Sequence, residues 1–178
     1  VNTQPVMLTA GVAVWRAWRH HDGPRPVAMA GHSLGEYTAL VCSGAIDFAA
    51  AIDLVRFRGQ VMQQAVPLGQ GAMAAILGLE DDALAAACRE AEQGEVVEPV
   101  NFNAPGQVVI SGARSAIERA VGLAPKYGAR RAVLLPVSAP FHCALMKPAA
   151  DAMKAALEGV AMLPPRVPLV ANVLASEI

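Results

Sequence analysis

A serine between two glycines, Gly31-His32-Ser33-Leu34-Gly35, fits the G-x-S-x-G pattern of a nucleophile elbow. An apolar run precedes it and helix-forming residues follow it, which is the strand-to-helix context that this turn requires. Glycines without a Cβ let the strand and the helix approach closely, and free N–H groups at the helix start can stabilise a negative oxygen. The pattern predicts a nucleophilic Ser33, with a tight turn and a capping serine as the alternative.

A serine nucleophile needs a base, and the chain has four histidines. His20 and His21 lie beside a charged helix end and are expected in solvent. Adjacent side chains on a turn point apart, so His32 is expected to pack under the elbow rather than act on Ser33. His142 follows the end of a predicted strand, where α/β folds collect active-site residues. We predict His142 as the base, with a buried, hydrogen-bonded histidine as the alternative.

A guanidinium lies on an apolar helix face. Over the predicted helix 48–65 an apolar stripe has helical spacing and consists of Leu54, Phe57, Val61, Met62 and Ala65. Arg58 falls inside this stripe, whereas Arg56 points the opposite way. Such a cation needs an anion, either an internal carboxylate or an anionic substrate, and its planar fork suits a carboxylate. With a serine nucleophile it indicates transfer of a dicarboxylic half-ester or thioester.

The elements that must position these residues alternate between helix and strand. Helices are expected at 6–18, with Thr3 as its cap, at 34–42 and at 48–65, and a short strand at 27–30. The segments 71–79, 81–91, 96–103, 107–112, 113–124 and 129–137 follow as strand, helix, strand, strand, helix and strand. A helix from about 148 and a strand-like run at 167–178 end the chain. This order predicts an α/β fold, with a split-βαβ, ferredoxin-like lobe at 67–137.

Composition limits the classes of partner. The 178 residues are 54% hydrophobic, which predicts one folded unit with a smaller lobe. The net charge of −1 gives no reason to expect a nucleic-acid partner. No apolar run is long enough for a membrane span and no signal pattern opens the chain, which predicts a soluble, cytoplasmic protein. Cys42, Cys88 and Cys143 lack metal-ligand spacing and are expected to be buried thiols. The opening without Met and the strand-like last run suggest a fragment.

Four ordered segments resemble a known family. They are GHSLGEYTAL, RFRGQVMQ, PVNFNAPGQVVISG and PVSAPFHCALMKPA, and they closely resemble the malonyl-CoA:acyl-carrier-protein transacylases and the acyltransferase domains of fatty-acid and polyketide synthases. The resemblance spans essentially the whole chain. It implies an incomplete α/β-hydrolase-like core, residues 1–66 and 138–178, with an inserted ferredoxin-like subdomain at 67–137.

The same resemblance implies an activity and a site. Malonyl would pass by a ping-pong route from malonyl-CoA to the phosphopantetheine thiol of acyl carrier protein, in a monomer without metal or cofactor. Ser33 would be acylated and His142 would be its base. The substrate-binding positions that the resemblance implies are Arg58 for the malonyl carboxylate, Leu34 for one oxyanion N–H, and Phe141, Met62 and Asn103. Phe141 resembles the malonyl-selective members. Asn101 and Asn103 both match family positions that face the cleft between the lobes, and local turn bonding is the alternative for both.

Two family segments have no match in the chain: an opening loop that supplies the second oxyanion N–H and a late glutamine region that orients the histidine. Removal of one oxyanion donor costs about 10²- to 10³-fold in rate. We therefore expect a fragment of reduced activity.

Three alternatives remain open. One is an acyltransferase domain excised from a polyketide synthase. An esterase or thioesterase would use the same elbow but pass the acyl group to water, with an acid between Ser33 and His142 in the chain. Four aspartates in that interval have the positions of helix-start or surface residues: Asp47, Asp53, Asp81 and Asp82. A docking module would present Lys126, Arg130 and Arg131 to an acidic carrier protein, but a solvated basic face is the favoured explanation, because surface charges need no partner.

Overall fold

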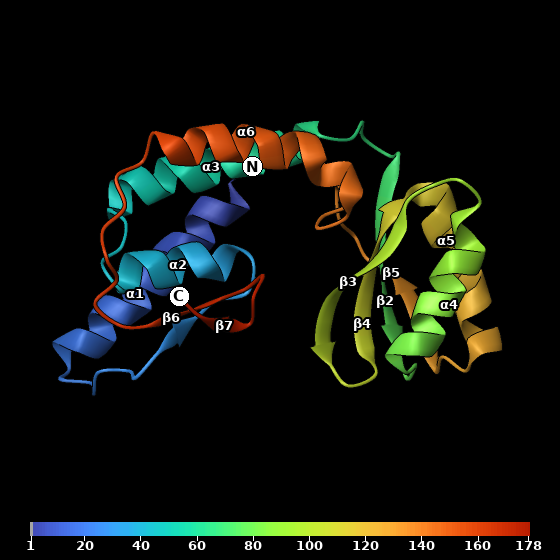
Figure 1. The fold of residues 1–178 in the computed structure, drawn as a ribbon, viewed down its shortest axis with the longest axis horizontal. Coiled ribbons are helices and arrows are strands. Elements are labelled where there is room, and N and C mark those ends of the chain that lie inside the picture. Colours follow the sequence, from blue (N-terminus) through green and yellow to red (C-terminus); the bar gives the residue numbers. More distant parts are fainter. Residues whose placement is uncertain (1) are drawn as a thin grey trace. The chain divides into compact units, whose positions relative to one another are not determined.

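The computed structural model describes residues 2–178, which form two compact units (Figure 1). The first unit comprises the described residues through Gln60 together with Ala152–Ile178, and the second is Val61–Asp151. Helices α3 (Phe48–Gln64) and α6 (Lys147–Glu158) contain the boundaries between them. The expected inserted segment 67–137 lies within the second unit, which extends further at both ends.

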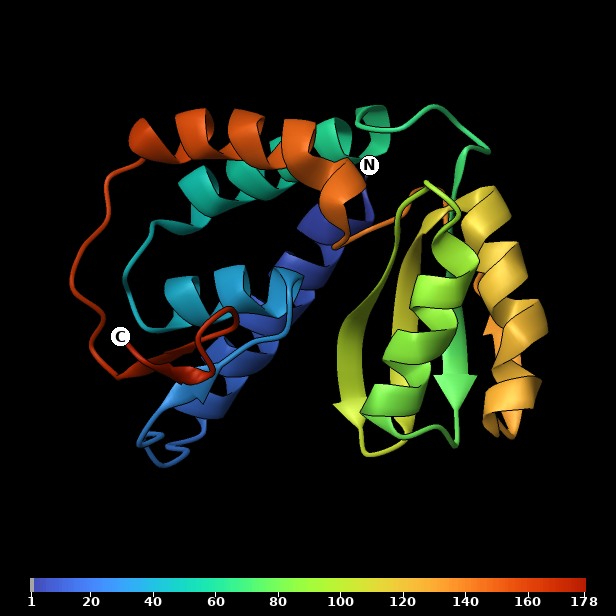
Figure 2. The ribbon, with the colours of Figure 1, turned by 45° about the vertical axis from the view of Figure 1, so that its right-hand side comes forward.

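The first unit holds a small sheet beside two helices. Strand β1 (Met29–Ala30) pairs in parallel with β6 (Leu169–Ala171), and β7 (Ser176–Glu177) pairs antiparallel with β6. Helices α1 (Thr3–His20) and α2 (Leu34–Cys42) pack on each other (Figure 2). Gly11 on α1 makes this approach close, because a Cβ there would lie 2.7 Å from Thr38 Cγ2. The chain leaves β1 and enters α2 directly, so the sheet edge fixes where α2 begins.

Two expectations for this unit are wrong. The run 167–178 is not one strand, because Ala175 has a positive φ of 49° and a turn there separates β6 from β7. Thr3 does not cap α1: it is already helical, and the preceding Asn2 is the N-cap without a side-chain hydrogen bond. A strand was expected over residues 27–30, and β1 forms only over the second half of this range, Met29–Ala30. The helix 34–42 has the predicted bounds.

The second unit has the predicted order of strand, helix, strand, strand, helix, strand. These elements are β2 (Gly71–Leu77), α4 (Asp81–Glu92), β3 (Val97–Ala104), β4 (Gln107–Ala113), α5 (Arg114–Leu123) and β5 (Arg131–Leu134). The short helix η1 (Ala124–Tyr127) lies between α5 and β5, and the short helix η2 (Ala144–Met146) follows β5. The sheet order is β3-β4-β2-β5, antiparallel throughout. Helices α4 and α5 lie on one face of it (Figure 1). Side chains of both helices and of three strands share one apolar core.

This core includes Cys88, which is 3% exposed. Burial raises the pKa of the Cys88 thiol from its ordinary 9.0 to about 11, and the neighbouring Glu92 adds to the rise. The unfolded chain loses this proton near pH 9 while the folded chain keeps it. The stability contributed by the neutral thiol is therefore complete below pH 9 and is lost as the pH rises toward 11.

We expect the free energy of unfolding to fall by about 2 kcal/mol more between pH 8 and pH 11 in the wild type than in Cys88→Ala. Urea unfolding at several pH values measures both slopes. Comparing the two slopes removes the contributions of the other groups that titrate in this range. Equal slopes would show that the Cys88 thiol is not the source. Cys143 is also buried, as predicted, whereas Cys42 is half-buried.

Two absences apply to residues 2–178. None of the helices there is both long and apolar enough to cross a membrane. No cluster of three or more His, Cys, Asp or Glu side chains in that range could hold a metal ion.

Candidate active site

Ser33 occupies a strained strand-to-helix turn. It is the N-cap of α2 with φ 52° and ψ −108°, in a region that side chains with a Cβ seldom adopt. A Cβ at Gly31 would overlap the carbonyl group of Gly35, so glycine is required at position 31. A Cβ at Gly35 would meet no such atom within 4 Å. The close approach of strand and helix therefore depends on Gly31. The expectation that this approach also requires a glycine at position 35 is wrong.

Arg58 contacts the hydroxyl of Ser33. Its Nη2 donates to Ser33 Oγ at 2.9 Å, and its Nη1 donates to Gln4 Oε1 at 2.7 Å. The guanidinium carbon lies 5.6 Å from the centroid of the Tyr37 ring, a cation–π distance. No carboxylate of the described chain forms an ion pair with Arg58. A half-buried cation thus lies beside the candidate nucleophile, where an anionic group could pair with it.

Burial shifts the pKa values of Arg58 and of the neighbouring Tyr37. Burial lowers the pKa of the Arg58 guanidinium, while Tyr37 and Glu36 act in the opposite direction. Burial also raises the pKa of the Tyr37 hydroxyl, which Arg58 partly offsets. A guanidinium keeps its proton at neutral pH, so Arg58 is a permanent cation that is only partly exposed to solvent. Such a cation interacts more strongly with an anion than it would in water.

The apolar stripe predicted on this helix is only partly correct. Leu54 and Met62 are buried, at 5% and 8% exposure, but Phe57 is 37% exposed. Val55, outside the predicted stripe, is fully buried. The buried face of α3 is centred near Ala51 and Val55, and Arg58, four residues from both Leu54 and Met62, lies within it although its side chain is half-exposed. The long side chain lets the guanidinium reach Ser33 Oγ while it keeps part of its contact with water.

The elbow is also bonded to the turn between β6 and β7. The backbone N–H of Ser33 donates to Asn172 Oδ1 at 3.0 Å, and the backbone N–H of Asn172 donates to Glu36 Oε1 at 3.0 Å. Four residues at the elbow were not predicted from the sequence: Asn172, Glu36, Gln4 and Tyr37. One signal was present: Ser33 and Glu36 form an S-x-x-E capping-box pattern. Nothing in the sequence marks the distant Asn172 or Gln4 as neighbours of the elbow.

His142 belongs to the second unit and lies in the loop before η2. It is exposed and has a positive φ of 68°. The loop is anchored at three points: Glu98 Oε2 accepts from the Ala144 N–H at 2.9 Å, Cys143 Sγ donates to Pro140 O at 3.2 Å, and Pro140 packs where a Cβ on Gly71 would lie. Since strands β2 and β3 provide two of these anchors, the sheet fixes the backbone that carries the imidazole.

The other positions predicted to bind substrate in the second unit differ in exposure. Met62 packs in an apolar cluster with Val66, Met146 and Ala149, and Phe141 packs against that cluster. Asn103 is exposed at an irregularity of β3, and Asn101 lies opposite Val109 in the β3–β4 ladder. The structure thus supports a packing role for Met62.

The remaining histidines lie on the surface. His20 and His21 are exposed, as expected. His32 is also exposed, so the prediction that it packs under the elbow is wrong. The turn directs the side chain before the nucleophile outward, which a residue pattern alone does not determine.

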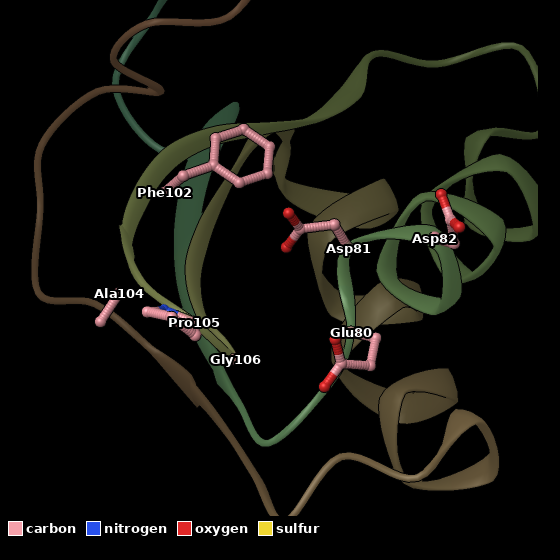
Figure 3. Close-up of a pocket in the computed structure, with 7 residues that line it drawn as sticks. All are labelled: Glu80, Asp81, Asp82, Phe102, Ala104, Pro105 and Gly106. Atoms are coloured by element: carbon pink, nitrogen blue, oxygen red, sulfur yellow. The ribbon is translucent and has the colours of Figure 1, made fainter.

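A hollow in the second unit is lined by carboxylates. Its volume is about 460 Å³ and Figure 3 shows Phe102 above Asp81, with Glu80 farther along the rim. The full lining is Glu80, Asp81, Asp82, Phe102, Ala104, Pro105 and Gly106. A carboxylate-bearing acyl group would be repelled there. The Arg58–Ser33 pair is therefore the better site for an anionic substrate.

The acids considered for an esterase triad are used elsewhere. Asp47 Oδ1 accepts from the N–H groups of Ala49 and Ala50, at 2.8 and 3.1 Å, and so caps α3. Asp81 and Asp82 form the first turn of α4, where acids favour the helix dipole. These are the helix-start roles predicted for them, and they disfavour the hydrolase alternative.

The sequence matches the acyl transferase domain family over residues 1–178, and the chain therefore belongs to that family. Among its relatives, the malonyl CoA-acyl carrier protein transacylase of Escherichia coli K12 is 58% identical over 172 residues. This match covers 97% of the chain and 56% of the relative, so the chain spans little more than half the relative's length. The resemblance based on four segments is confirmed.

Solved structures agree in fold. The acyl-carrier-protein S-malonyltransferase of Burkholderia pseudomallei superimposes with a TM-score of 0.97 at 56% identity, covering 99% of this chain and 58% of that one. A malonyl-transacylase solved in complex with a type II PKS acyl-carrier protein gives 0.97 at 54% identity, covering 99% and 57%. The predicted α/β class is confirmed.

Proposed function

We propose that the protein containing this chain transfers a malonyl group from malonyl-CoA to the phosphopantetheine thiol of an acyl carrier protein through an acyl-serine intermediate. The observation that carries the proposal is the 2.9 Å contact between Arg58 Nη2 and Ser33 Oγ. It joins a candidate nucleophile to a cation suited to a carboxylate. The names of the relatives support the donor and the acceptor.

The contact also favours a short dicarboxylic acyl group. In a malonyl ester of Ser33 one methylene separates the ester carbon from the free carboxylate. A guanidinium already beside Ser33 Oγ can bind this carboxylate after a small displacement. A neutral acetyl group would leave the half-buried cation without an anion, which is unfavourable.

In the first half-reaction His142 accepts the proton of Ser33 Oγ as this oxygen attacks the thioester carbon of malonyl-CoA. The carbonyl oxygen becomes negative, and the N–H of Leu34 at the start of α2 stabilises it. When the intermediate collapses the C–S bond breaks, and the CoA thiolate leaves with the proton from His142. Ser33 then carries a malonyl ester.

In the second half-reaction the phosphopantetheine thiol gives its proton to His142 and attacks the ester carbon. The bond between that carbon and Ser33 Oγ breaks, and Oγ takes the proton back. The malonyl thioester of the carrier protein leaves. The balance needs neither an oxidant nor a reductant. The proposal requires the His142 imidazole to reach Ser33 Oγ in the complete protein.

We also propose the finer fold assignment: an incomplete α/β-hydrolase-like core over 1–66 and 138–178, with a ferredoxin-like insert at 67–137. The antiparallel order β3-β4-β2-β5 with two helices on one face supports the insert. The parallel β1–β6 pair with the elbow between β1 and α2 supports the core. A cytoplasmic location is part of the proposal, because both thioesters are charged and water-soluble.

Incubating the complete protein with radiolabelled malonyl-CoA tests the function. Label that remains on the protein and then passes to a pantetheine thiol is the expected result. Label that is released as malonate without a thiol would indicate a hydrolase. No label at all would indicate a docking module.

A second candidate differs only in the acceptor pathway. One solved relative is a malonyl-transacylase bound to a type II PKS acyl-carrier protein. A carrier protein of polyketide synthesis is therefore an alternative to one of fatty-acid synthesis. Transfer rates to holo carriers of both kinds distinguish these two acceptors.

Replacing Arg58 with alanine should lower kcat/KM for malonyl-CoA by about 10²-fold, since about two charge-assisted hydrogen bonds to the carboxylate are lost. The ratio of malonyl to acetyl transfer should fall with it. Arg58→Lys keeps the charge without the fork and should lie between the two. Arg56→Ala is the control, because Arg56 is exposed on the same helix. An unchanged malonyl-to-acetyl ratio in Arg58→Ala would remove this role.

A further inference from the structure

Two hydrogen bonds join the elbow to a segment 139 residues away in the chain. Ser33 donates its backbone N–H to the side chain of Asn172, and Asn172 donates its backbone N–H to the side chain of Glu36. Each segment thus supplies one main-chain donor and one side-chain acceptor. We call this pair of bonds the elbow clamp. We propose that Asn172 is a positioning residue that acts through Ser33, and this inference rests on the proposed role of Ser33 as the nucleophile.

The clamp acts where the backbone lacks its own support. The N–H of Gly35 donates to the carbonyl of His32, and the N–H of Glu36 donates to the carbonyl of Ser33. These two bonds close the first turn of α2. The N–H of Ser33 precedes this turn and so has no acceptor within the helix. Asn172 Oδ1 supplies that acceptor. At φ 52° the Ser33 peptide is strained, and a bond that holds its N–H opposes relaxation to a negative φ.

The sheet explains why Asn172 is at the right place. Ala30 of β1 lies opposite Val170 of β6, and these two strands are parallel. Ser33 and Asn172 each follow this pair by two or three residues, so both lie beyond the carboxyl ends of the two parallel strands. A side-chain amide of asparagine length then spans the remaining gap. Long-range register, not local sequence, therefore creates the clamp.

The consequence concerns the direction of Ser33 Oγ. A change in φ at Ser33 rotates its Cβ and hydroxyl relative to the peptide that carries its N–H, and so displaces the hydroxyl from Arg58 Nη2. A displacement of about 1 Å at a reacting atom can cost about 10²-fold in rate. Loss of the clamp should therefore slow every reaction of Ser33, including reactions that do not use Arg58.

The test uses two readouts on the complete protein. Labelling by a fluorophosphonate measures the reactivity of Ser33 without a malonyl group, and amide hydrogen exchange measures protection of the Ser33 N–H. In Asn172→Ala we expect exchange of this amide to rise about tenfold. Labelling should slow about ten- to a hundredfold, and the Tm should fall by less than about 4 °C. Val173→Ala, in the same turn and 90% exposed, should match the wild type in all three.

Glu36 gives the conservative comparison. Glu36→Gln keeps an oxygen acceptor for the Asn172 N–H and should label within about threefold of the wild type, whereas Glu36→Ala should slow labelling about tenfold. The double variant Glu36→Ala/Asn172→Ala should label no more slowly than Asn172→Ala, because both bonds hold one unit.

Three results would overturn the clamp: unchanged Ser33 amide exchange in Asn172→Ala, unchanged labelling in that variant, or equal losses in Glu36→Gln and Glu36→Ala. A wild-type protein that reacts with fluorophosphonate but not with malonyl-CoA would refute the proposed substrate alone. The exchange and labelling comparisons would still decide the clamp.

Discussion

We expect the replacement of Ser33 with alanine to abolish covalent labelling by malonyl-CoA and to lower malonyl transfer by about 10⁴-fold or more. No other group can form the ester if Ser33 Oγ is the nucleophile. Alanine keeps the Cβ, so it meets the same strain at φ 52° as serine and the backbone turn is retained. The loss therefore reports on the hydroxyl. Mass spectrometry of the intact protein after brief exposure to malonyl-CoA measures the label, and steady-state transfer to holo carrier protein measures the rate.

Ser176→Ala is the matched control, because Ser176 is exposed on β7 and should label like the wild type. A malonyl adduct that persists on Ser33→Ala would place the nucleophile elsewhere. Digestion and peptide mapping of that adduct would then identify the residue. Loss of label together with a large drop in Tm would implicate folding instead.

The contact between Arg58 and Ser33 has an electrostatic consequence besides the carboxylate binding proposed for Arg58. A guanidinium N–H that donates to Oγ stabilises negative charge on this oxygen as its proton leaves. Gln4 and Tyr37 hold the guanidinium from two further directions, through a hydrogen bond and a ring contact. The cation is thus oriented before substrate arrives, and little reorganisation is needed when charge develops.

Local signals predicted the elements around the site well. The helix 34–42 has its predicted bounds because a turn glycine before it and Gly44 after it, with φ 81°, mark both ends. The order of the second unit also followed from periodicity and turn residues. Each of these features depends on residues close together in the chain.

What the sequence did not predict depends on distant contacts. The bond from Ser33 to Asn172 depends on the β1–β6 register, and the bond from Arg58 to Gln4 joins two helices whose residues are 54 positions apart in the chain. The buried face of α3 is set by its neighbours rather than by its own stripe, which is why Phe57 is more exposed than predicted. The sequence predicts functional roles for Ser33 and Arg58 separately, but their direct contact depends on how α2 and α3 are placed in the fold.

Replacing His142 with alanine should slow acylation of Ser33 by about 10²- to 10⁴-fold, the usual contribution of general acid–base catalysis. Without the imidazole the Oγ proton must pass to water, and the CoA thiolate must leave without a proton donor. Rapid-quench measurement of the first turnover with malonyl-CoA isolates this step. Added imidazole should restore part of the rate, because it can enter the space left by the side chain.

Two hydrogen bonds that hold the loop around His142 do not involve the imidazole, so the backbone should stay in place in His142→Ala. Glu98 and Cys143 bind the loop through backbone groups of Ala144 and Pro140, so removal of the His142 side chain leaves both anchors. His20→Ala, on the exposed end of α1, controls for a general loss of imidazole and should acylate at the wild-type rate. A normal first-turnover rate in His142→Ala would exclude it as the base. Another group would then have to accept the Ser33 proton.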